Sequence, residues 1–168
     1  DNSKTFIFVT DEESLAIYQY EITSYAPISA KLVRTIPTQS VSEGCVVDDD
    51  LKILYFSQED EKSGIFKTTA MPEGGNIETI DLIKPSGNIT GDSEGLALVK
   101  LPDQTLLISS SQDSNEYLIY TTGTENQYLG KFTIATSTID GTSETDGIEA
   151  FYGSLNPQFP LGIFIAQD

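Results

Sequence analysis

Short runs of β-branched and aromatic residues alternate with clusters of turn-forming residues along the whole chain. The apolar runs occupy residues 5–9, 16–20, 53–56, 105–108, 117–120 and 162–165. Turn residues gather between them, at residues 48–50, 72–75, 102–103 and 121–123. Runs of this length and composition, separated by turns at hairpin spacing, are typical of β-strands, and no stretch of helical period interrupts them. The pattern therefore predicts an all-β fold.

An acidic residue followed by glycine recurs at nearly constant spacing. The three steps, 51 and 52 residues apart, are Glu43-Gly44, Glu94-Gly95 and Asp146-Gly147. Each step is followed by a strand that ends in a short run of polar or acidic residues, which we call its tag. The three tags end at Asp60, Asp113 and Asp168. Residues 6–11 fit the same tagged strand one period earlier. A repeat of about 50 residues with about four short strands indicates a β-propeller, with about three blades in one domain over residues 1–168.

Propeller geometry gives the recurrent acids a common location, because the innermost strands of all blades line one central channel. The candidates for an acidic cluster there are Glu43, Glu59, Asp60, Asp92 and Glu94. The Asp92-Ser93-Glu94 spacing places two carboxylates on one face of an extended segment. The alternative interpretation is that an acid followed by glycine makes a turn, and that acids at strand ends are solvated. Recurrence in register favours the cluster, and divalent cations would neutralise it.

A second acidic segment covers residues 140–149, Asp-Gly-Thr-Ser-Glu-Thr-Asp-Gly-Ile-Glu. Its oxygen-bearing side chains fall at alternate positions, which suits calcium, although glycine and glutamate do not have the spacing of an EF-hand. A polar turn without a metal is the alternative. Residues 48–50, three aspartates, are expected to form the solvated tip of a hairpin.

Charge narrows the choice of partners. Asp and Glu number 26 against 9 Lys and Arg, which gives a formal charge of -17. Such a surface repels nucleic acid and anionic membranes and attracts cations, so neither is expected as a partner. A substrate that carries phosphate would need a metal between itself and this surface.

Two absences narrow the chemistry. The chain has no His, so enzymes with a Ser-His-Asp triad, phosphohistidine phosphatases and the usual His-ligated zinc sites are excluded as function classes. The single Cys45 lies in an apolar run and is expected to be a small buried hydrophobic residue. Calcium and magnesium remain as metals for ligands that are all oxygen. Because the chain starts without Met and stops inside a strand-like segment, we expect a processed or excised piece of a longer protein.

Six motifs, in order along nearly the whole chain, resemble the β-propeller phytases. They lie at residues 42–49, 59–61, 92–96, 110–112, 140–148 and 160–168. The resemblance implies a six-bladed, calcium-dependent phosphohydrolase, secreted or periplasmic, that removes phosphate from phytate. This chain resembles the middle to C-terminal part of such a propeller.

The resemblance also implies roles for individual residues. Glu43, Glu59, Asp92 and Glu94 match acids around catalytic calcium ions, and with them Asp60, Asp140, Asp146 and Asp168 are expected to be metal ligands. The implied reaction is hydrolysis by water activated on calcium that also bridges substrate phosphate oxygens, with phytate bound as its calcium complex.

Two positions depart from the family pattern. Glu12 is acidic near a position where the family has a phosphate-binding Lys, and Gln58 stands where members often have an acid. Glu12 favours an alternative, an incomplete and non-catalytic module that binds calcium or calcium phytate. A third hypothesis is a calcium-stabilised propeller that binds sugars or mediates adhesion. Unpaired blade edges would accept either the remaining blades or a second copy of the chain.

Overall fold

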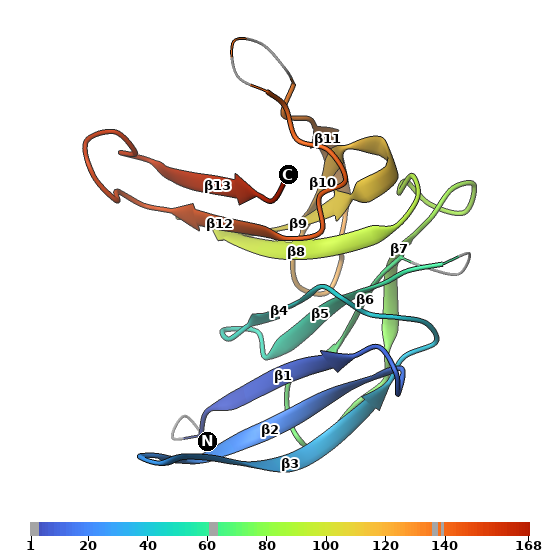
Figure 1. The fold of residues 1–168 in the computed structure, drawn as a ribbon, viewed down its shortest axis with the longest axis vertical. Helices are drawn as coiled ribbons and strands as arrows, with labels where there is room; N and C mark the ends of the chain where they lie inside the picture. The colour runs from blue at the N-terminus through green and yellow to red at the C-terminus, as the bar shows by residue number, and fades with distance from the viewer. Residues whose placement is uncertain (1–3, 61–63, 136–137, 139) are drawn as a thin grey trace.

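A computed structural model describes residues 4–60, 64–135, 138 and 140–168, and it confirms the all-β prediction (Figure 1). The described residues form thirteen strands in four antiparallel sheets, together with one three-residue 3-10 helix, η1 (Gln112–Ser114). None of the described residues belongs to a helix with the length and hydrophobicity needed to cross a lipid bilayer.

The four sheets follow the order of the chain. Sheet 1 contains β1 (Phe6–Asp11), β2 (Ala16–Tyr25) and β3 (Ile28–Pro37). Sheet 2 contains β4 (Cys45–Asp48), β5 (Ile53–Gln58), β6 (Gly64–Thr69) and β7 (Glu78–Leu82). Sheet 3 contains β8 (Ser93–Lys100), β9 (Thr105–Ser111), β10 (Glu116–Thr121) and β11 (Tyr128–Phe132). Sheet 4 contains β12 (Ile148–Tyr152) and β13 (Gly162–Ala166).

The sheets succeed one another along an arc, with sheet 1 and sheet 4 at its two ends (Figure 1). Within each sheet the strands pair in sequence order, so that every connection is between antiparallel neighbours. Between sheets, β8 contacts both β4 and β12. The first strands of sheets 2, 3 and 4 therefore lie next to one another across the sheet boundaries.

Alternation along the strands supplies two core faces to each central sheet, because successive side chains of a strand point to opposite faces. On β5, Leu54 and Phe56 pack toward sheet 1 with Ile17 and Ile36, and all four are buried. Tyr55 points to the opposite face and packs with residues of sheet 3. That second core cluster contains Tyr55, Ile65, Ile89, Leu96, Leu107, Leu118 and Tyr120.

Aromatic and polar side chains complete the remaining contacts. The rings of Tyr117, Phe132 and Phe164 lie 5.1 to 5.3 Å apart and join sheet 3 to sheet 4. Lys67 of β6 is buried, and its Nζ donates to the carbonyl oxygens of Gly123 and Thr124, at 2.8 and 3.1 Å. Sheets 2 and 3 are thus held by a buried ammonium group as well as by apolar packing.

The glycines of the acid-Gly steps have a packing role. A Cβ atom on Gly44 would lie 2.0 Å from the carbonyl oxygen of Glu94, and a Cβ on Gly95 would lie 2.3 Å from that of Asp146. Neither glycine has a positive φ. For the first two steps the interpretation as simple turns is therefore wrong, because Gly44 and Gly95 are required by the close approach of one sheet's first strand to the next.

The pairing of the strands shows that the sequence comparison aligned the last tag with the wrong residues of the other two. Cys45, Leu96 and Ile148 each follow an acid-Gly step, and they face Phe56, Ser109 and Ala166 respectively. Asp168 lies two residues after Ala166, so it corresponds to Gln58 and Ser111 rather than to Asp60 and Asp113. The sequence comparison had aligned Asp168 with Asp60 and Asp113 because each tag ends in an aspartate.

Two smaller expectations have mixed outcomes. Cys45 is half-buried and packs against the core between sheets 1 and 2, as expected of a small hydrophobic residue, and burial raises the pKa of its thiol. Asp49 and Asp50 lie exposed in the β4–β5 turn. Asp48 was expected to be solvated with them, but it is buried, and its Oδ1 accepts hydrogen bonds from the backbone N–H groups of Asp50 and Leu51.

Candidate metal centre

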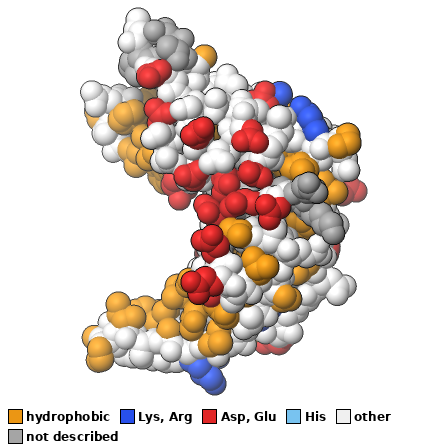
Figure 2. Space-filling view, turned by 45° about the vertical axis from the view of Figure 1, so that its right-hand side comes forward, with side chains coloured by type: hydrophobic (Ala, Val, Ile, Leu, Met, Phe, Trp, Pro, Cys, Tyr) orange, Lys and Arg blue, Asp and Glu red, His pale blue; other side chains and the backbone are white. Residues whose placement is uncertain are grey.

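Three glutamates from two neighbouring sheets converge at the junction of β4, β5 and β8. Glu43 precedes β4, Glu59 follows β5, and Glu94 lies near the start of β8. Each offers a carboxylate oxygen, and these three oxygens lie within 4.8 Å of one another. Acidic side chains gather on the hollowed side of the arc in the space-filling view (Figure 2). The sequence prediction that these three acids meet is confirmed in geometry.

The three carboxylates differ in burial. Glu43 is exposed, Glu59 is half-buried, and Glu94 is 4% exposed. Among the described residues, Oε1 of Glu59 and Oε2 of Glu94 are buried and have no hydrogen-bond partner. Buried polar atoms normally have partners, because the loss of hydration is otherwise uncompensated. A ligand that accepts carboxylate oxygens would satisfy both atoms.

Burial and mutual repulsion change the acidity of this cluster. Loss of hydration, followed by the charge of Glu43, raises the pKa of Glu59 from 4.5 to about 7. Loss of hydration, followed by the charge of Glu59, raises the pKa of Glu94 from 4.5 to about 8. Near neutral pH the cluster therefore retains protons unless a cation replaces them.

Asp60 and Asp92 flank the three glutamates. The backbone N–H of Asp60 donates to Oδ1 of Asp92 at 3.2 Å, which links the end of β5 to the segment before β8. Asp92 adds to the charge that raises the pKa of both Glu59 and Glu94. Both aspartates thus lie at the edge of the cluster, as the sequence predicted. Glu61, in the motif at residues 59–61, lies outside the described residues.

Asp140 and Asp146 lie in the connection before β12, and Asp168 follows β13. Oδ1 of Asp168 accepts hydrogen bonds from the backbone N–H and hydroxyl of Ser143, at 2.8 and 3.2 Å. Oδ1 of Asp146 accepts a hydrogen bond from Nε2 of Gln112 at 2.6 Å, and the charge of Asp146 also contributes to the raised pKa of Glu94. Oδ1 of Asp140 accepts a hydrogen bond from the N–H of Gly141 at 3.0 Å. These three aspartates do not belong to the close glutamate cluster.

The structure shows the surroundings of Glu12 and Gln58, the two positions that depart from the family pattern. The charge of Glu12, in the turn after β1, contributes to the raised pKa of Glu59. Gln58 is buried, and its Oε1 accepts hydrogen bonds from the N–H groups of Gln39 and Ser40, at 2.6 and 3.2 Å. Gln58 therefore anchors the segment that leads to Glu43. Glu12 lies near the cluster as an additional acid.

Sequence reasoning missed the residue that holds the backbone at the first acid-Gly step. Oγ of Ser57 accepts a hydrogen bond from the N–H of Gly44 at 3.0 Å and donates to its carbonyl oxygen at 3.2 Å. This contact sets the position of Glu43 relative to β5. The only signal in the sequence was a serine inside a tag of polar residues, which fits many other roles.

The donor set suits a hard divalent cation. Calcium prefers several carboxylate and carbonyl oxygens, and the three glutamates supply carboxylates at mutual distances that one ion can span. Two of their oxygens are buried without partners. The residues present therefore fit a calcium ion on chemical grounds.

Comparison with known proteins gives the same family as the motifs. The sequence matches the Phytase family over residues 2–168. It is 38% identical over 154 residues to a 3-phytase of Bacillus subtilis, and the match covers 89% of this chain and 40% of that protein.

A solved structure from Desulfotomaculum acetoxidans, described as functionally unknown, is 20% identical with a TM-score of 0.49 and covers 81% of this chain and 41% of its own. The chain thus spans less than half the length of the proteins it matches. By its sequence, this chain belongs to the phytase family.

Proposed function

We propose that this chain carries the calcium-binding part of a phytase, which hydrolyses phosphate monoesters of phytate with water activated at the glutamate cluster. The observation that carries the proposal is the convergence of Glu43, Glu59 and Glu94, with buried and unpartnered oxygens on Glu59 and Glu94. Membership of the phytase family supplies the substrate class. The 3-phytase of Bacillus subtilis, 38% identical, supports the same assignment.

The residues of the cluster would have distinct tasks. Glu94 and Glu59 would hold the cation from the protein side, because their free oxygens are already removed from water. Glu43, which is exposed, would face the substrate side. Calcium, when bound, would supply a Lewis acid that polarises phosphate oxygens and lowers the pKa of a bound water. Asp60 and Asp92 would keep the site acidic at its edge.

The charge of the chain supports a substrate that binds through metal. Phytate is a polyanion, and the protein has a formal charge of -17. The neighbours whose charges raise the pKa of Glu59 and Glu94 are all carboxylates. Phytate would therefore bind as its calcium complex, because cations screen the repulsion between the two partners.

The finer structural proposal is that the sheets are blades of a six-bladed propeller with the acids around its axis. The arc of sheets and the contacts of β8 with β4 and β12 support this arrangement. We extend the proposal to Asp140, Asp146 and Asp168 as ligands of further calcium ions, and to a secreted or periplasmic location.

An alternative function, binding of calcium or calcium phytate without turnover, is favoured by one observation. Glu12 adds negative charge beside Glu59, where a cationic side chain would stabilise a phosphate. A module of this kind would bind calcium as tightly as the enzyme. It would release no phosphate.

The experiment measures calcium binding and phosphate release together. Isothermal titration gives the calcium affinity of the chain and of Glu94→Gln, with Glu73→Gln, an exposed glutamate in the β6–β7 connection, as the matched control. Phosphate release from phytate is followed with added calcium and with a chelator in parallel.

Calcium-dependent release that Glu94→Gln abolishes would support the enzyme. Calcium binding without release would favour the non-catalytic module. If Glu94→Gln binds calcium as tightly as the unaltered chain, the glutamate cluster is not the metal site and the proposal fails.

A further inference from the structure

Gln58, Ser111 and Asp168, which correspond to one another by strand register, make the same kind of hydrogen bond. In each sheet this position lies two residues beyond the partner of the residue that follows an acid-Gly step. A side-chain oxygen of each accepts a hydrogen bond from a backbone N–H of the connection that enters the first strand of its own sheet. The contact is therefore a repeated feature of the sheets, like the acid-Gly step itself.

Gln58 holds the connection that enters β4. Its Oε1 accepts hydrogen bonds from the N–H groups of Gln39 and Ser40, at 2.6 and 3.2 Å. The next residue, Glu59, donates its backbone N–H to the carbonyl oxygen of Val41 at 3.0 Å, two residues before the acid-Gly step. Gln58 thus fixes the backbone that leads to the first glutamate of the cluster, and it directly precedes the second.

Ser111 holds the connection that enters β8 in the same way. Its Oγ accepts a hydrogen bond from the N–H of Thr90 at 3.2 Å and donates to the carbonyl oxygen of Thr90 at 2.6 Å. The next residue, Gln112, donates its backbone N–H to the carbonyl oxygen of Asp92 at 3.0 Å, again two residues before the acid-Gly step. Ser111 thus fixes the backbone from which Asp92 and Glu94 extend.

The residue type at this position varies, whereas an acceptor oxygen is present each time. Sheet 2 has an amide at Gln58, and sheet 3 has a hydroxyl at Ser111. Sheet 4 has a carboxylate at Asp168, which accepts from the N–H of Ser143 at 2.8 Å. The position supplies a hydrogen-bond acceptor for the backbone, and all three side chains can do so with or without charge. Gln58 is therefore suited to this task, although the family often has an acid there.

The two connections depend on these contacts because they run outside the strands. Residues 38–44 and 90–92 belong to no strand, and Ser40 is nevertheless buried. Backbone N–H groups in buried segments need acceptors from the protein, since water does not reach them. In the described part of the chain, Oε1 of Glu59 and Oε2 of Glu94 have no hydrogen-bond partner that could hold them. The positions of these carboxylates therefore depend on the backbone that carries them.

The two connections meet in the backbone contact at Gly44. A Cβ atom there would lie 2.0 Å from the carbonyl oxygen of Glu94. Gln58 fixes the segment on one side of this contact, and Ser111 fixes the segment on the other side. A shift of either segment would change the separation of Glu43 and Glu94, whose carboxylates each place an oxygen within 4.8 Å of the other.

We propose that Gln58 and Ser111 are positioning residues of the metal centre, which hold the backbone of the two connections so that the three glutamates converge. They act through backbone N–H and carbonyl groups, and neither needs to contact the cation. Their effect on calcium rests on the proposed function, whereas their effect on the connections does not. Replacement of residues that orient metal ligands commonly lowers metal affinity about tenfold or more.

Replacements of Gln58 by residues of similar length test the acceptor. Gln58→Met removes it, and Gln58→Glu keeps an oxygen that both N–H groups can use. Amide hydrogen exchange in a chelator reports on the connection, and calorimetric titration reports on calcium affinity. Gln58→Met should speed exchange at Ser40 at least about tenfold and weaken calcium binding at least about tenfold. Gln58→Glu should keep exchange slow and bind calcium as tightly as the unaltered chain.

Ser111→Ala is an independent test on the other side of the cluster. It leaves the N–H and the carbonyl oxygen of Thr90 without their partner. Exchange at Thr90 should become at least about tenfold faster, and calcium binding should weaken at least about tenfold. Because this variant removes a single oxygen atom from a buried side chain, it should fold even if Gln58→Met does not.

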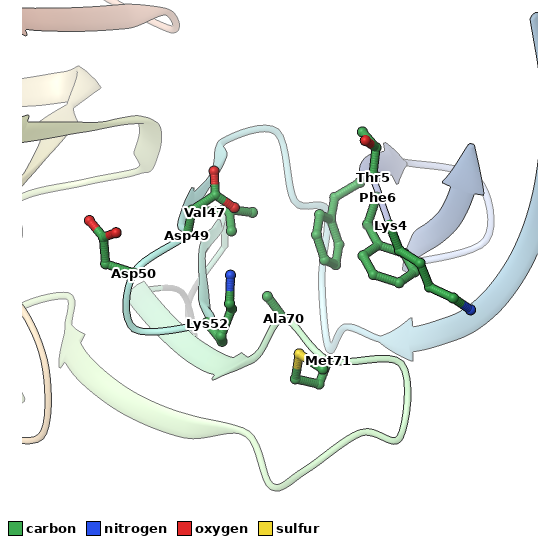
Figure 3. Close-up of a pocket in the computed structure, with 10 residues that line it drawn as sticks. Lys4, Thr5, Phe6, Val47, Asp49, Asp50, Lys52, Ala70 and Met71 are labelled. Atoms are coloured by element: carbon green, nitrogen blue, oxygen red, sulfur yellow. The ribbon is translucent and has the colours of Figure 1, made fainter. Parts of the chain in front are cut away.

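Gln19→Met is the matched control for a hydrogen bond lost from a buried glutamine. Nε2 of Gln19 donates to the carbonyl oxygen of Ala70 at 2.8 Å, and Gln19 is fully buried. The N–H of Ala70 donates to the carbonyl oxygen of Lys52, at the end of β5 opposite Gln58. With Lys52 and Met71, Ala70 lines a pocket of about 620 Å³ (Figure 3). Gln19→Met should lower stability and leave calcium affinity within about twofold of its original value.

All variants are compared at a temperature at which circular dichroism shows them to be folded. Unchanged exchange at Ser40 in Gln58→Met and at Thr90 in Ser111→Ala would overturn the proposal. Faster exchange with unchanged calcium affinity would also overturn it, as would an equal loss of affinity in Gln19→Met or Gln58→Glu. If the unaltered chain binds no calcium, the proposed function fails, and exchange at these two amides then decides by itself whether the two side chains hold the connections.

Discussion

Two groups of acids in this chain have similar composition and different surroundings. Glu43, Glu59 and Glu94 lie at a junction closed by backbone contact between Gly44 and Glu94. Asp146 and Asp168 lie near the open step at Gly147, where their carboxylates accept hydrogen bonds from Gln112 and Ser143. The first group has buried oxygens without partners, and the second is already engaged with protein donors.

The difference shows what distinguishes a candidate metal site from an acidic surface. Acid-Gly steps occur in both places, so the residue types alone do not separate them. The closed junction removes water from Glu59 and Glu94, and repulsion within the cluster then raises their pKa values. A site that requires a cation is therefore produced by packing, which places carboxylates together and excludes solvent from them.

The largest expected effect comes from closing the space at Gly44. Gly44→Ala places a Cβ 2.0 Å from the Glu94 carbonyl oxygen, so β4 and β8 must separate. We expect a loss of about 3 kcal/mol in unfolding free energy and a loss of calcium binding. Urea denaturation and calorimetric titration measure the two quantities.

Gly147→Ala, which has open space around it, is the matched change at the other step. It should keep the stability of the unaltered chain within about 0.5 kcal/mol. Equal losses in both variants would show that the two junctions do not differ.

The next effect is on calcium affinity. Glu94→Gln removes charge from the most buried carboxylate of the cluster and should weaken calcium binding at least about tenfold. The same variant should be more stable than the unaltered chain in a chelator at pH 8, because an amide has no ionised form to desolvate. A variant that loses stability and keeps its calcium affinity would contradict both expectations.

The pH dependence of stability is a third test. The folded pKa values of about 7 for Glu59 and about 8 for Glu94 lie above the ordinary value of 4.5. The folded state therefore binds more protons than the unfolded state between these values. Without metal, the contribution of these two groups to stability should be fully present below about pH 4.5 and should be lost as pH rises to about 8.

Denaturation midpoints at pH 5 and pH 8 in a chelator measure this fall. Glu94→Gln should reduce it, and saturating calcium should oppose it. A fall of the same size in Glu94→Gln would assign the pH dependence to the dispersed negative charge of the chain.

The smallest effect is expected at Asp168, which lies near the open step at Gly147. Asp168→Asn keeps an oxygen that can accept the hydrogen bonds from Ser143. Stability should change by less than about 0.5 kcal/mol, and affinity at the glutamate cluster by less than about threefold. A larger loss of affinity would place Asp168 in the same metal site as Glu94.

Much of the architecture follows from local pattern. The apolar runs at residues 53–56 and 117–120 became the cores of β5 and β10, because short alternating segments between turns have few other ways to bury their side chains. Strands such as β3 and β11 were not predicted, since their exposed residues carry a weaker apolar signal. The convergence of Glu43 and Glu94 followed from the period of the acid-Gly step.

By itself, the sequence determined the all-β class, the repeat near 50 residues, the family and the acids that could form a cluster. Only the tertiary structure decided that Glu94 is buried while Glu43 is exposed, and that Asp168 aligns with Gln58. The physical reason is that desolvation and register depend on contacts between residues far apart in the chain. The residue type alone does not show whether a carboxylate contacts water or another strand.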